Sequence, residues 1–285
     1  MITVVDTLHS SLKLYRLSTN NIRLIPDFII IGAQRGGTTS LYAYLCRHPA
    51  VLPAAMKEVH FFDTNFQRGL SWYRAQFPSV MHKRLAEQLH GTPVITGEAS
   101  PYYLFHPRVP ERVAALLPAT KLIVLLRNPV LRAYSHYHHE VERGHEQLSF
   151  EEALTQEEVR TREEVEQLEQ NEYYYSYNHQ HYTYQTRGLY AEQLERWFQY
   201  FPREQFLILK SEDFYAHTSA ALEQVATFLN IAPAPFQRTQ YTALNGSTYK
   251  QPEMNALTKR RLMEYYHPHN TRLYQLLNRD FGWDY

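Results

Sequence analysis

The chain has 285 residues, and its 29 basic and 29 acidic side chains give a formal net charge of zero. This balance provides no general attraction to nucleic acid or to an anionic membrane. The single cysteine, Cys46, excludes an internal disulfide and a zinc site built from several thiolates. Hydrophobic residues make up 44% of the chain, which is typical of a protein that folds around a core.

The first residues, MITVVDTLHSSLKLYRLSTNN, are interrupted by polar side chains throughout. No run in the sequence approaches the ~20 apolar residues of a membrane span or forms the apolar centre of a secretion signal. We therefore expect a cytoplasmic protein with no membrane span and no nucleic-acid partner. We also expect residues 1–285 to form a single domain.

Four short apolar runs predict buried strands, and helical patterns lie between or after them. The runs are residues 27–32, 93–98, 120–127 and 204–210. Strands without polar alternation, separated by helices, indicate an α/β fold with a central, mainly parallel sheet flanked by helices. In such folds the ligands bind beyond the carboxyl ends of the strands.

The first strand runs into a glycine-rich loop and a helix start, IIIGAQRGGTTS. Two adjacent glycines can expose consecutive backbone N–H groups, and the helix N-terminus adds partial positive charge. The alternative is an ordinary glycine turn capped by threonine. The candidate phosphate ligands are Arg35, Gly36, Gly37, Thr38, Thr39 and Ser40.

This loop lacks the lysine of a Walker-type loop, because Thr38 follows the second glycine. The third apolar run ends in Arg127, where a nucleotide triphosphatase usually carries an acidic residue for magnesium. The pattern therefore favours phosphate binding by direct cationic contact, without a metal ion. A P-loop kinase or nucleotide hydrolase and a catalytically silent nucleotide-binding protein are the alternatives.

A second anion site is indicated by the segment RNPVLRAYSHYHHEVERG. Arg127 stands at a strand end, and Ser135 follows about two helical turns later, so both side chains can face the same edge of the sheet. A structural arginine and a helix serine are the alternative. His136, His138 and His139 do not lie four residues apart on one helix face, so we expect packing or surface roles for them.

These segments together resemble the sulfotransferases. PDFIIIGAQRGGTTSLYAYLCRHP, KEVHFFD, RNPVLRAYSHY and the final LNRDFGWDY are most similar to the heparan sulfate sulfotransferase branch and its bacterial relatives. The resemblance implies that the donor is 3′-phosphoadenosine 5′-phosphosulfate (PAPS) and that no metal is needed. It also implies that the loop holds the 5′-phosphosulfate and that Arg127 with Ser135 holds the 3′-phosphate.

Arg35 departs from the family pattern, since many relatives carry lysine at this position. Arginine keeps the charge but cannot release its proton. We therefore expect Arg35 to stabilise the departing phosphate oxygen electrostatically, and not to act as a general acid.

The segment KEVHFFD supplies the candidate base. In the family that the chain resembles, a glutamate of this segment takes the acceptor proton, and the matching residue is Glu58. Lys57 and His60 can tune or replace it, and Lys57 is also a candidate acceptor contact. His60 is the second candidate for the base because the cytosolic branch uses a histidine. The alternative is a surface Lys57–Glu58 pair followed by core residues.

Two further segments resemble parts of the family's substrate sites. GEASPYYLF follows the second predicted strand, so Glu98 and Ser100 are candidates for the acceptor cleft, or for a buried or helix-capping role. LNGSTYKQP resembles a late loop that closes over the nucleotide, with Lys250 as its cation and Gly246 and Ser247 as backbone donors. A plain surface turn is the alternative.

Residues 145–187 form an insertion that we expect to act as an acceptor-side lid. A capping box of Ser149 with Glu152 predicts the start of an acidic, solvated helix, and YYYSYNHQHYTYQTRG follows that helix. Tyr174, Tyr175 and Tyr177 can stack on an acceptor and bind its hydroxyls. An aromatic loop packed on the body or a homodimer contact is the alternative. The expected acceptor is a hydroxyl, with an amine as second choice, on a saccharide, a small alcohol or a carrier-bound substrate.

Overall fold

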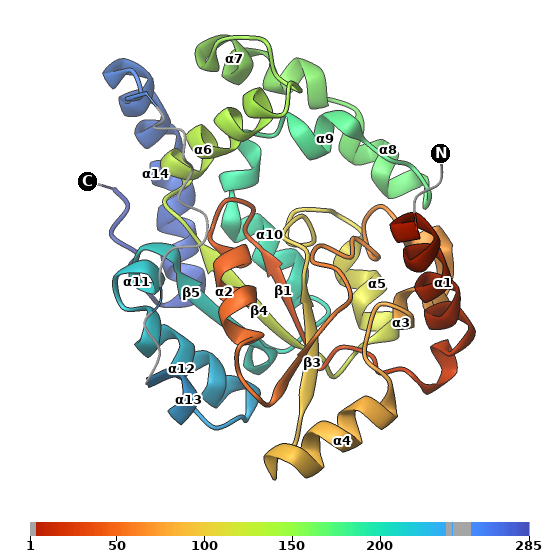
Figure 1. Ribbon diagram of the computed structural model, residues 1–285. Coiled ribbons are helices and arrows are strands. Elements are labelled where there is room, and N and C mark those ends of the chain that lie inside the picture. The colour runs from red at the N-terminus through yellow and green to blue at the C-terminus, as the bar shows by residue number, and fades with distance from the viewer. Residues whose placement is uncertain (1–3, 238–240, 242–251, 285) are drawn as a thin grey trace.

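The computed structural model describes residues 4–237, 241 and 252–284, and its centre is a five-stranded parallel sheet in the order β2-β3-β1-β4-β5 (Figure 1). The strands are β1 (Phe28–Gly32), β2 (Val51–Pro53), β3 (Ile95–Ala99), β4 (Lys121–Leu126) and β5 (Phe206–Lys210). The predicted fold class and the four predicted strands are confirmed. The sequence did not reveal β2, because this edge strand has only three residues and lies in a segment interrupted by Pro49 and Pro53.

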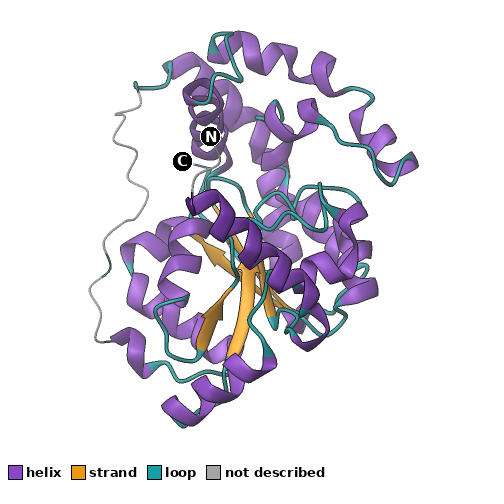
Figure 2. Ribbon diagram, turned by 45° about the vertical axis from the view of Figure 1, so that its right-hand side comes forward, coloured by secondary structure: helices purple, strands orange, loops and turns teal. Residues whose placement is uncertain are grey.

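Both faces of the sheet are buried, which explains why the strands show no polar alternation. Ile29 and Ile31 pack into one core cluster, and Phe28 and Ile30 pack into another. Helices cover both faces (Figure 2). One face is covered by α2 (Thr38–Leu45), α11 (Ser211–Ala216) and α12 (Thr218–Leu229), and the other by α3 (Gly69–Arg74), α5 (Val109–Leu116) and α10 (Tyr190–Phe198).

A further layer of helices lies beyond the carboxyl ends of the strands, at the top of Figure 1. It contains α6 (Pro129–Glu142), α7 (Phe150–Thr161), α8 (Glu164–Gln170), α9 (Tyr177–His181) and part of α14 (Ala256–Leu277). A third cluster, which includes Phe150, Tyr184 and Tyr266, holds α6, α7 and α14 together. The functional edge of the sheet is therefore covered by a helical layer.

The predicted acidic helix after residue 149 begins where expected, with a full capping box between Ser149 and Glu152. The prediction of one solvated helix is wrong, because the segment forms two helices, α7 and α8, and part of it is buried. The buried Glu157 carboxylate accepts hydrogen bonds from the backbone N–H groups of Gln185 and Thr186, at 2.6 and 2.8 Å. This side chain ties α7 to the tyrosine-rich segment.

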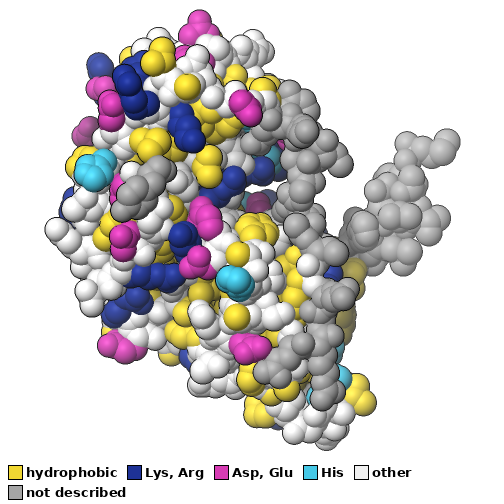
Figure 3. Space-filling view, turned by 90° about the vertical axis from the view of Figure 1, so that its left-hand side faces the viewer, with side chains coloured by type: hydrophobic (Ala, Val, Ile, Leu, Met, Phe, Trp, Pro, Cys, Tyr) yellow, Lys and Arg dark blue, Asp and Glu magenta, His cyan; other side chains and the backbone are white. Residues whose placement is uncertain are grey.

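Three further helices and four 3-10 turns complete the helical segments of the described residues. They are α1 (Val4–Ser18), α4 (Val80–His90), α13 (Ala234–Gln237) and the 3-10 turns Asn20–Ile22, Phe66–Arg68, Thr186–Gly188 and Arg203–Gln205. No helix in the described part of the chain has the length and apolar character needed to cross a membrane. On the face that carries α6, α11 and α14, Lys and Arg side chains gather beside a hollow (Figure 3).

Candidate active site

The glycine loop between β1 and α2 has the backbone geometry of an anion cradle. Gly37 is the N-cap of α2 and has a φ of 103°, in the region that favours glycine. A Cβ on Gly36 would lie 2.5 Å from the carbonyl oxygen of Leu125, so only glycine lets the loop approach β4 this closely. The first turn of α2 therefore presents its free N–H groups at the carboxyl edge of the sheet.

A cleft of about 700 Å³, called the main cleft below, opens at this edge. Its lining includes five Lys and Arg side chains and three carboxylates, which suits a ligand with several negative charges. Eight predicted site residues line it: Arg35, Gly37, Thr38, Thr39, Lys57, Glu58, His60 and Arg127. The loop, the candidate base and the strand-end arginine thus meet in one cavity.

The other predicted residues within the described part of the chain do not line the main cleft. Gly36 packs against the backbone of Leu125 in β4, and Ser40 is fully buried within α2. Gly246, Ser247 and Lys250 lie outside the described residues. The described residues that were predicted and lie outside the cleft lining also include Glu98, Ser100, Ser135, Tyr174, Tyr175 and Tyr177.

Arg35 and Arg127 form a cationic pair beside the loop. Arg127 donates to the carbonyl oxygen of Arg35 at 3.1 Å, and its own carbonyl accepts from the Tyr190 hydroxyl at 2.8 Å. Burial lowers the pKa of both arginines, and their proximity lowers that of Arg35 further. Both stay charged, because a guanidinium is not deprotonated in proteins. Together they concentrate positive charge at the strand ends.

Ser135 is buried on α6 and contacts Arg35. The Arg35 Nε–H donates to Ser135 Oγ at 3.0 Å, and Arg35 Nη1 lies 3.3 Å from His139 Nδ1. The two predicted anion sites are therefore joined in this structure through Arg35.

Glu58 and His60 form an ion pair on the cleft wall. Glu58 Oε1 accepts from Lys57 Nζ at 2.6 Å, and Glu58 Oε2 lies 3.5 Å from His60 Nε2. Burial acts to raise the pKa of Glu58, but the hydrogen bonds from His60 and Lys57 outweigh it and lower that pKa to about 2. Glu58 is therefore an anion at neutral pH, with lone pairs available to a proton.

His60 is held from its other side by Asp63. The distance between His60 Nδ1 and Asp63 Oδ2 is 2.7 Å, and the Asp63 side chain is fully buried. Burial acts to lower the pKa of His60, but Asp63 and Glu58 outweigh it and raise that pKa to about 10. His60 is therefore a cation at neutral pH and has no free lone pair. This charge state favours Glu58 over His60 as the base.

Backbone strain accompanies this pair. Glu58 and His60 both have positive φ angles, of 58° and 51°. Such angles are costly for residues other than glycine and cluster at functional sites. Lys57 also donates to Thr39 of the glycine loop, so the segment with the candidate base is tied directly to the cradle.

Glu98 and Ser100 lie behind this wall and not in the cleft. Both are fully buried. Ser100 Oγ donates to Glu98 at 2.8 Å and accepts from the backbone N–H of His60 at 3.2 Å. Burial raises the pKa of Glu98 to about 7, although the Tyr73 hydroxyl donates to it. Glu98, near the end of β3, and Ser100, just after it, therefore hold the His60 backbone in place and do not face the cleft.

The tyrosine-rich segment reaches the main cleft through residues that the sequence did not single out. Gln180, His181 and Arg187 line it, whereas Tyr174, Tyr175 and Tyr177 do not. Tyr174 donates instead to Glu164 at 2.9 Å, and Tyr175 and Tyr177 are exposed.

Arg187 has the most constrained position of these side chains. It is buried, lies over the rings of Tyr102 and Phe105, and donates to Gln34 and to the carbonyl oxygens of His179 and Gln180. Nothing in the local sequence distinguishes this arginine from a solvated one.

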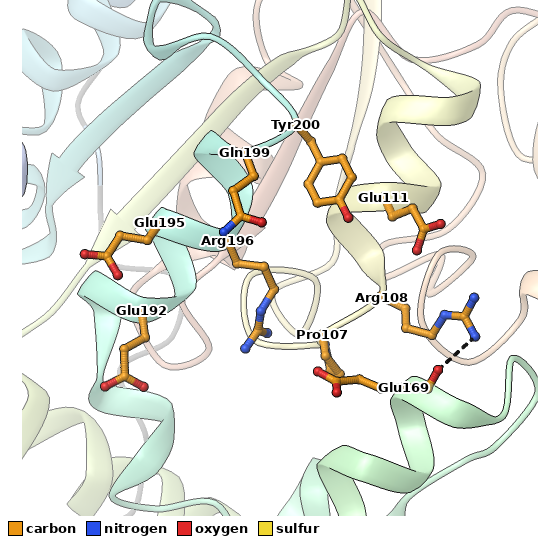
Figure 4. Close-up of a pocket in the computed structure, with 9 residues that line it drawn as sticks. All are labelled: Pro107, Arg108, Glu111, Glu169, Glu192, Glu195, Arg196, Gln199 and Tyr200. Atoms are coloured by element: carbon orange, nitrogen blue, oxygen red, sulfur yellow. Dashed lines mark hydrogen bonds between the residues drawn. The ribbon is translucent and has the colours of Figure 1, made fainter.

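Two other hollows differ in chemistry from the main cleft. One, of about 470 Å³, lies between α5, α8 and α10 and is lined by four glutamates and two arginines (Figure 4). Its acidic excess is unsuited to a phosphate ligand. Another, of about 700 Å³, lies between α1 and α3 and includes Leu12, Met56 and Trp72. Glu58 and His60 line this cavity as well as the main cleft, so the candidate base can be approached from two sides.

Comparison with known proteins identifies the family. The sulfotransferase domain model matches residues 25–269. Heparan sulfate glucosamine 3-O-sulfotransferase 6 of Homo sapiens is 30% identical over 281 residues, covering 92% of this chain and 74% of the relative. Heparan sulfate glucosamine 3-O-sulfotransferase 3B1 of Homo sapiens is 30% identical over 287 residues, which cover 94% of this chain and 67% of the relative.

A solved structure agrees with these matches. The sulfotransferase from Alicyclobacillus acidocaldarius is 29% identical, covers 92% of this chain and 100% of its own, and gives a TM-score of 0.69. The resemblance read from the sequence is confirmed. The chain belongs to the sulfotransferase family and is a transferase enzyme.

Proposed function

We propose that this enzyme transfers a sulfuryl group from PAPS to a hydroxyl, with Glu58 as the general base. The observation that carries the proposal is the position of an ionised Glu58 in the same cleft as the glycine loop and Arg127. A nucleotide with two separate anionic groups fits the donors of this cleft. The loop N–H groups suit the 5′-phosphosulfate. Arg127 suits the 3′-phosphate together with Ser135, which is buried beside Arg35.

The transfer forms a bond from sulfur to the acceptor oxygen and breaks the bond from sulfur to the 5′-phosphate oxygen. Glu58 accepts the proton that the acceptor loses. Arg35 and the N-terminus of α2 stabilise the negative charge that develops on the departing phosphate oxygen. No residue needs to act as a general acid, because that phosphate leaves as an anion.

Lys57 links donor binding to the strength of the base. Its ammonium contacts both Thr39 and Glu58, so an anion bound at the loop competes with Glu58 for this charge. Weaker contact with Lys57 raises the proton affinity of Glu58, since that contact is one cause of its low pKa. The base thus becomes stronger when the donor is in place.

A saccharide hydroxyl is the acceptor class that we favour, because the matched relatives are named as heparan sulfate glucosamine sulfotransferases. Small alcohols and carrier-bound hydroxyls are the other classes to test. We assign acceptor selection to residues 145–187, treated as an insertion into one domain, since Gln180, His181 and Arg187 line the cleft. The cytoplasmic location stays a prediction.

The kinase or hydrolase alternative meets a structural obstacle. Glu212 is a cleft carboxylate near the strand ends. One of its oxygens accepts from the Asn128 backbone N–H at 2.9 Å and the other lies 3.4 Å from Trp283 Nε1. It is therefore engaged in holding the start of α6 and the C-terminal segment. A silent nucleotide binder would not need Glu58 and His60 in strained conformations.

The test combines binding and transfer. Calorimetry with 3′,5′-adenosine bisphosphate in excess chelator should show tight binding, and Arg127→Ala should weaken it by about 1.5–3 kcal/mol, the scale of a hydrogen bond to a charged group. A screen with PAPS that carries radiolabelled sulfate should then find transfer to one acceptor class. Preference for ATP with magnesium, or binding without transfer to any class, would overturn the proposal.

A further inference from the structure

Three side chains from different parts of the helical layer converge on one point at the edge of the main cleft. Glu140 comes from α6, His145 from the loop after α6, and His181 from the end of α9. Glu140 Oε2 lies 2.9 Å from His145 Nδ1 and 2.8 Å from His181 Nδ1. The two Nδ1 atoms lie 3.2 Å apart. Three potential ligand atoms therefore form a compact, nearly equilateral triangle.

The size of this triangle fits a metal ion. Its centre lies about 1.7 Å from each atom, so an ion about 1.1 Å out of the plane would make bonds of about 2.0 Å, the usual length for zinc with nitrogen and carboxylate ligands. Two imidazoles and one carboxylate are a donor set that transition metals prefer, whereas magnesium and calcium prefer oxygen ligands. The geometry needs little rearrangement to accept such an ion.

Hydrogen bonding alone accounts for this cluster poorly. If both Nδ1 atoms donate to Glu140 Oε2, two N–H groups crowd against one oxygen at 3.2 Å from each other. If one of them accepts instead, its lone pair lies against the lone pairs of the carboxylate oxygen. A cation is favourable to all three atoms at once.

Neighbouring side chains hold Glu140 in position for metal binding. Glu140 is almost fully buried, and its other oxygen, Oε1, lies 3.3 Å from Nε2 of the buried His136. Metal ligands are commonly oriented by such outer partners. Glu140 and His181 also line the main cleft, so a fourth coordination position can face the cavity. Sites with three protein ligands usually keep a fourth position for water or substrate.

We propose that Glu140, His145 and His181 bind a divalent transition metal ion, with Zn²⁺ as the preferred occupant. The ion joins α9 to α6 and so fixes the part of residues 145–187 that borders the cleft (Figure 1). None of its three ligands is a residue that we assign to the donor, so the proposal gives the ion no part in donor binding. This site departs from the expectation, drawn from the sequence, that the chain holds no metal.

The experiment measures metal binding directly, without donor or acceptor. Chelator-treated protein is titrated with Zn²⁺ against a chromophoric competitor and, separately, with Co²⁺ while visible absorption is recorded. One equivalent should bind, and Co²⁺ should give the strong bands of a four-coordinate site. His145→Ala should weaken binding more than 100-fold, since loss of an outer partner alone costs about 10–100-fold.

Controls separate this site from adventitious binding. His90→Ala removes an exposed histidine of α4 and should leave the affinity unchanged. Glu140→Gln preserves shape and should lose tight binding while the thermal midpoint of the metal-free protein shows that the fold persists. Absence of one-equivalent binding, or equal affinity in the wild-type protein and His145→Ala, would overturn the proposal. Binding of adenosine bisphosphate in chelator is a separate result that bears only on the transferase function.

Discussion

Replacing Asp63 by asparagine tests whether His60 is a fixed cation or the catalytic base. In the structure the 2.7 Å contact with Asp63 is the main attraction that holds the pKa of His60 at about 10, against the effect of burial. At pH 7 only about one molecule in 1,000 then has neutral His60. Asparagine removes this charge, while Glu58 remains 3.5 Å from the other ring nitrogen. We expect the pKa of His60 to fall to about 7.

The pH dependence of kcat/KM distinguishes the two roles. If Glu58 is the base and the His60 cation supports it, the wild-type profile is flat from pH 6 to 9. The Asp63→Asn profile then falls above about pH 7, as His60 loses its proton. Transfer of radiolabelled sulfate gives the rates, and the His60 ring signal in NMR spectra gives its pKa directly. The signal is assigned with His60→Gln.

The opposite outcome would refute this reasoning. If neutral His60 is the base, wild-type activity rises with pH toward 10, and Asp63→Asn raises activity near pH 7. Folding stability supplies a second check. Because the pKa of His60 is raised from its ordinary 6.5, its ion pairs stabilise the fold fully below pH 6.5 and are lost as the pH rises to about 10. Asp63→Asn should therefore cost about 3 kcal/mol at pH 6, and less at high pH.

The sheet and the loop could be predicted because their signals are local. Continuous apolar runs indicate strands buried on both faces, and the adjacent glycines at the end of β1 indicate a tight turn into a helix. The edge strand β2 has only three residues and ends in Pro53, and proline argues against a strand in the sequence. Its place in the sheet depends on pairing with β3.

The candidate site was only partly predictable, because tertiary packing decides which polar residues face the cleft. Glu98 lies near the carboxyl end of β3, as a site residue would, yet Tyr73 and Ser100 enclose it. Arg187 looks like a surface residue, yet aromatic rings bury it. The one overlooked local signal was the four-residue spacing of His136 and Glu140, which places both on one face of α6.

The remaining predictions concern the base, the loop and the insertion. Glu58→Gln should lower turnover about 10²–10⁴-fold in single-turnover assays and leave adenosine bisphosphate affinity nearly unchanged. Gly36→Ala should abolish donor binding in calorimetry, because its Cβ would lie 2.5 Å from a β4 carbonyl oxygen. Alanine at Tyr174, Tyr175 and Tyr177 should change the acceptor KM or acceptor preference without changing donor affinity, because this segment borders the cleft through neighbouring residues such as Gln180. The exposed rings can reach a long acceptor that extends beyond the cavity. If acceptor kinetics stay constant while sedimentation shows a changed oligomeric state, the tyrosines form an assembly surface and the acceptor assignment fails.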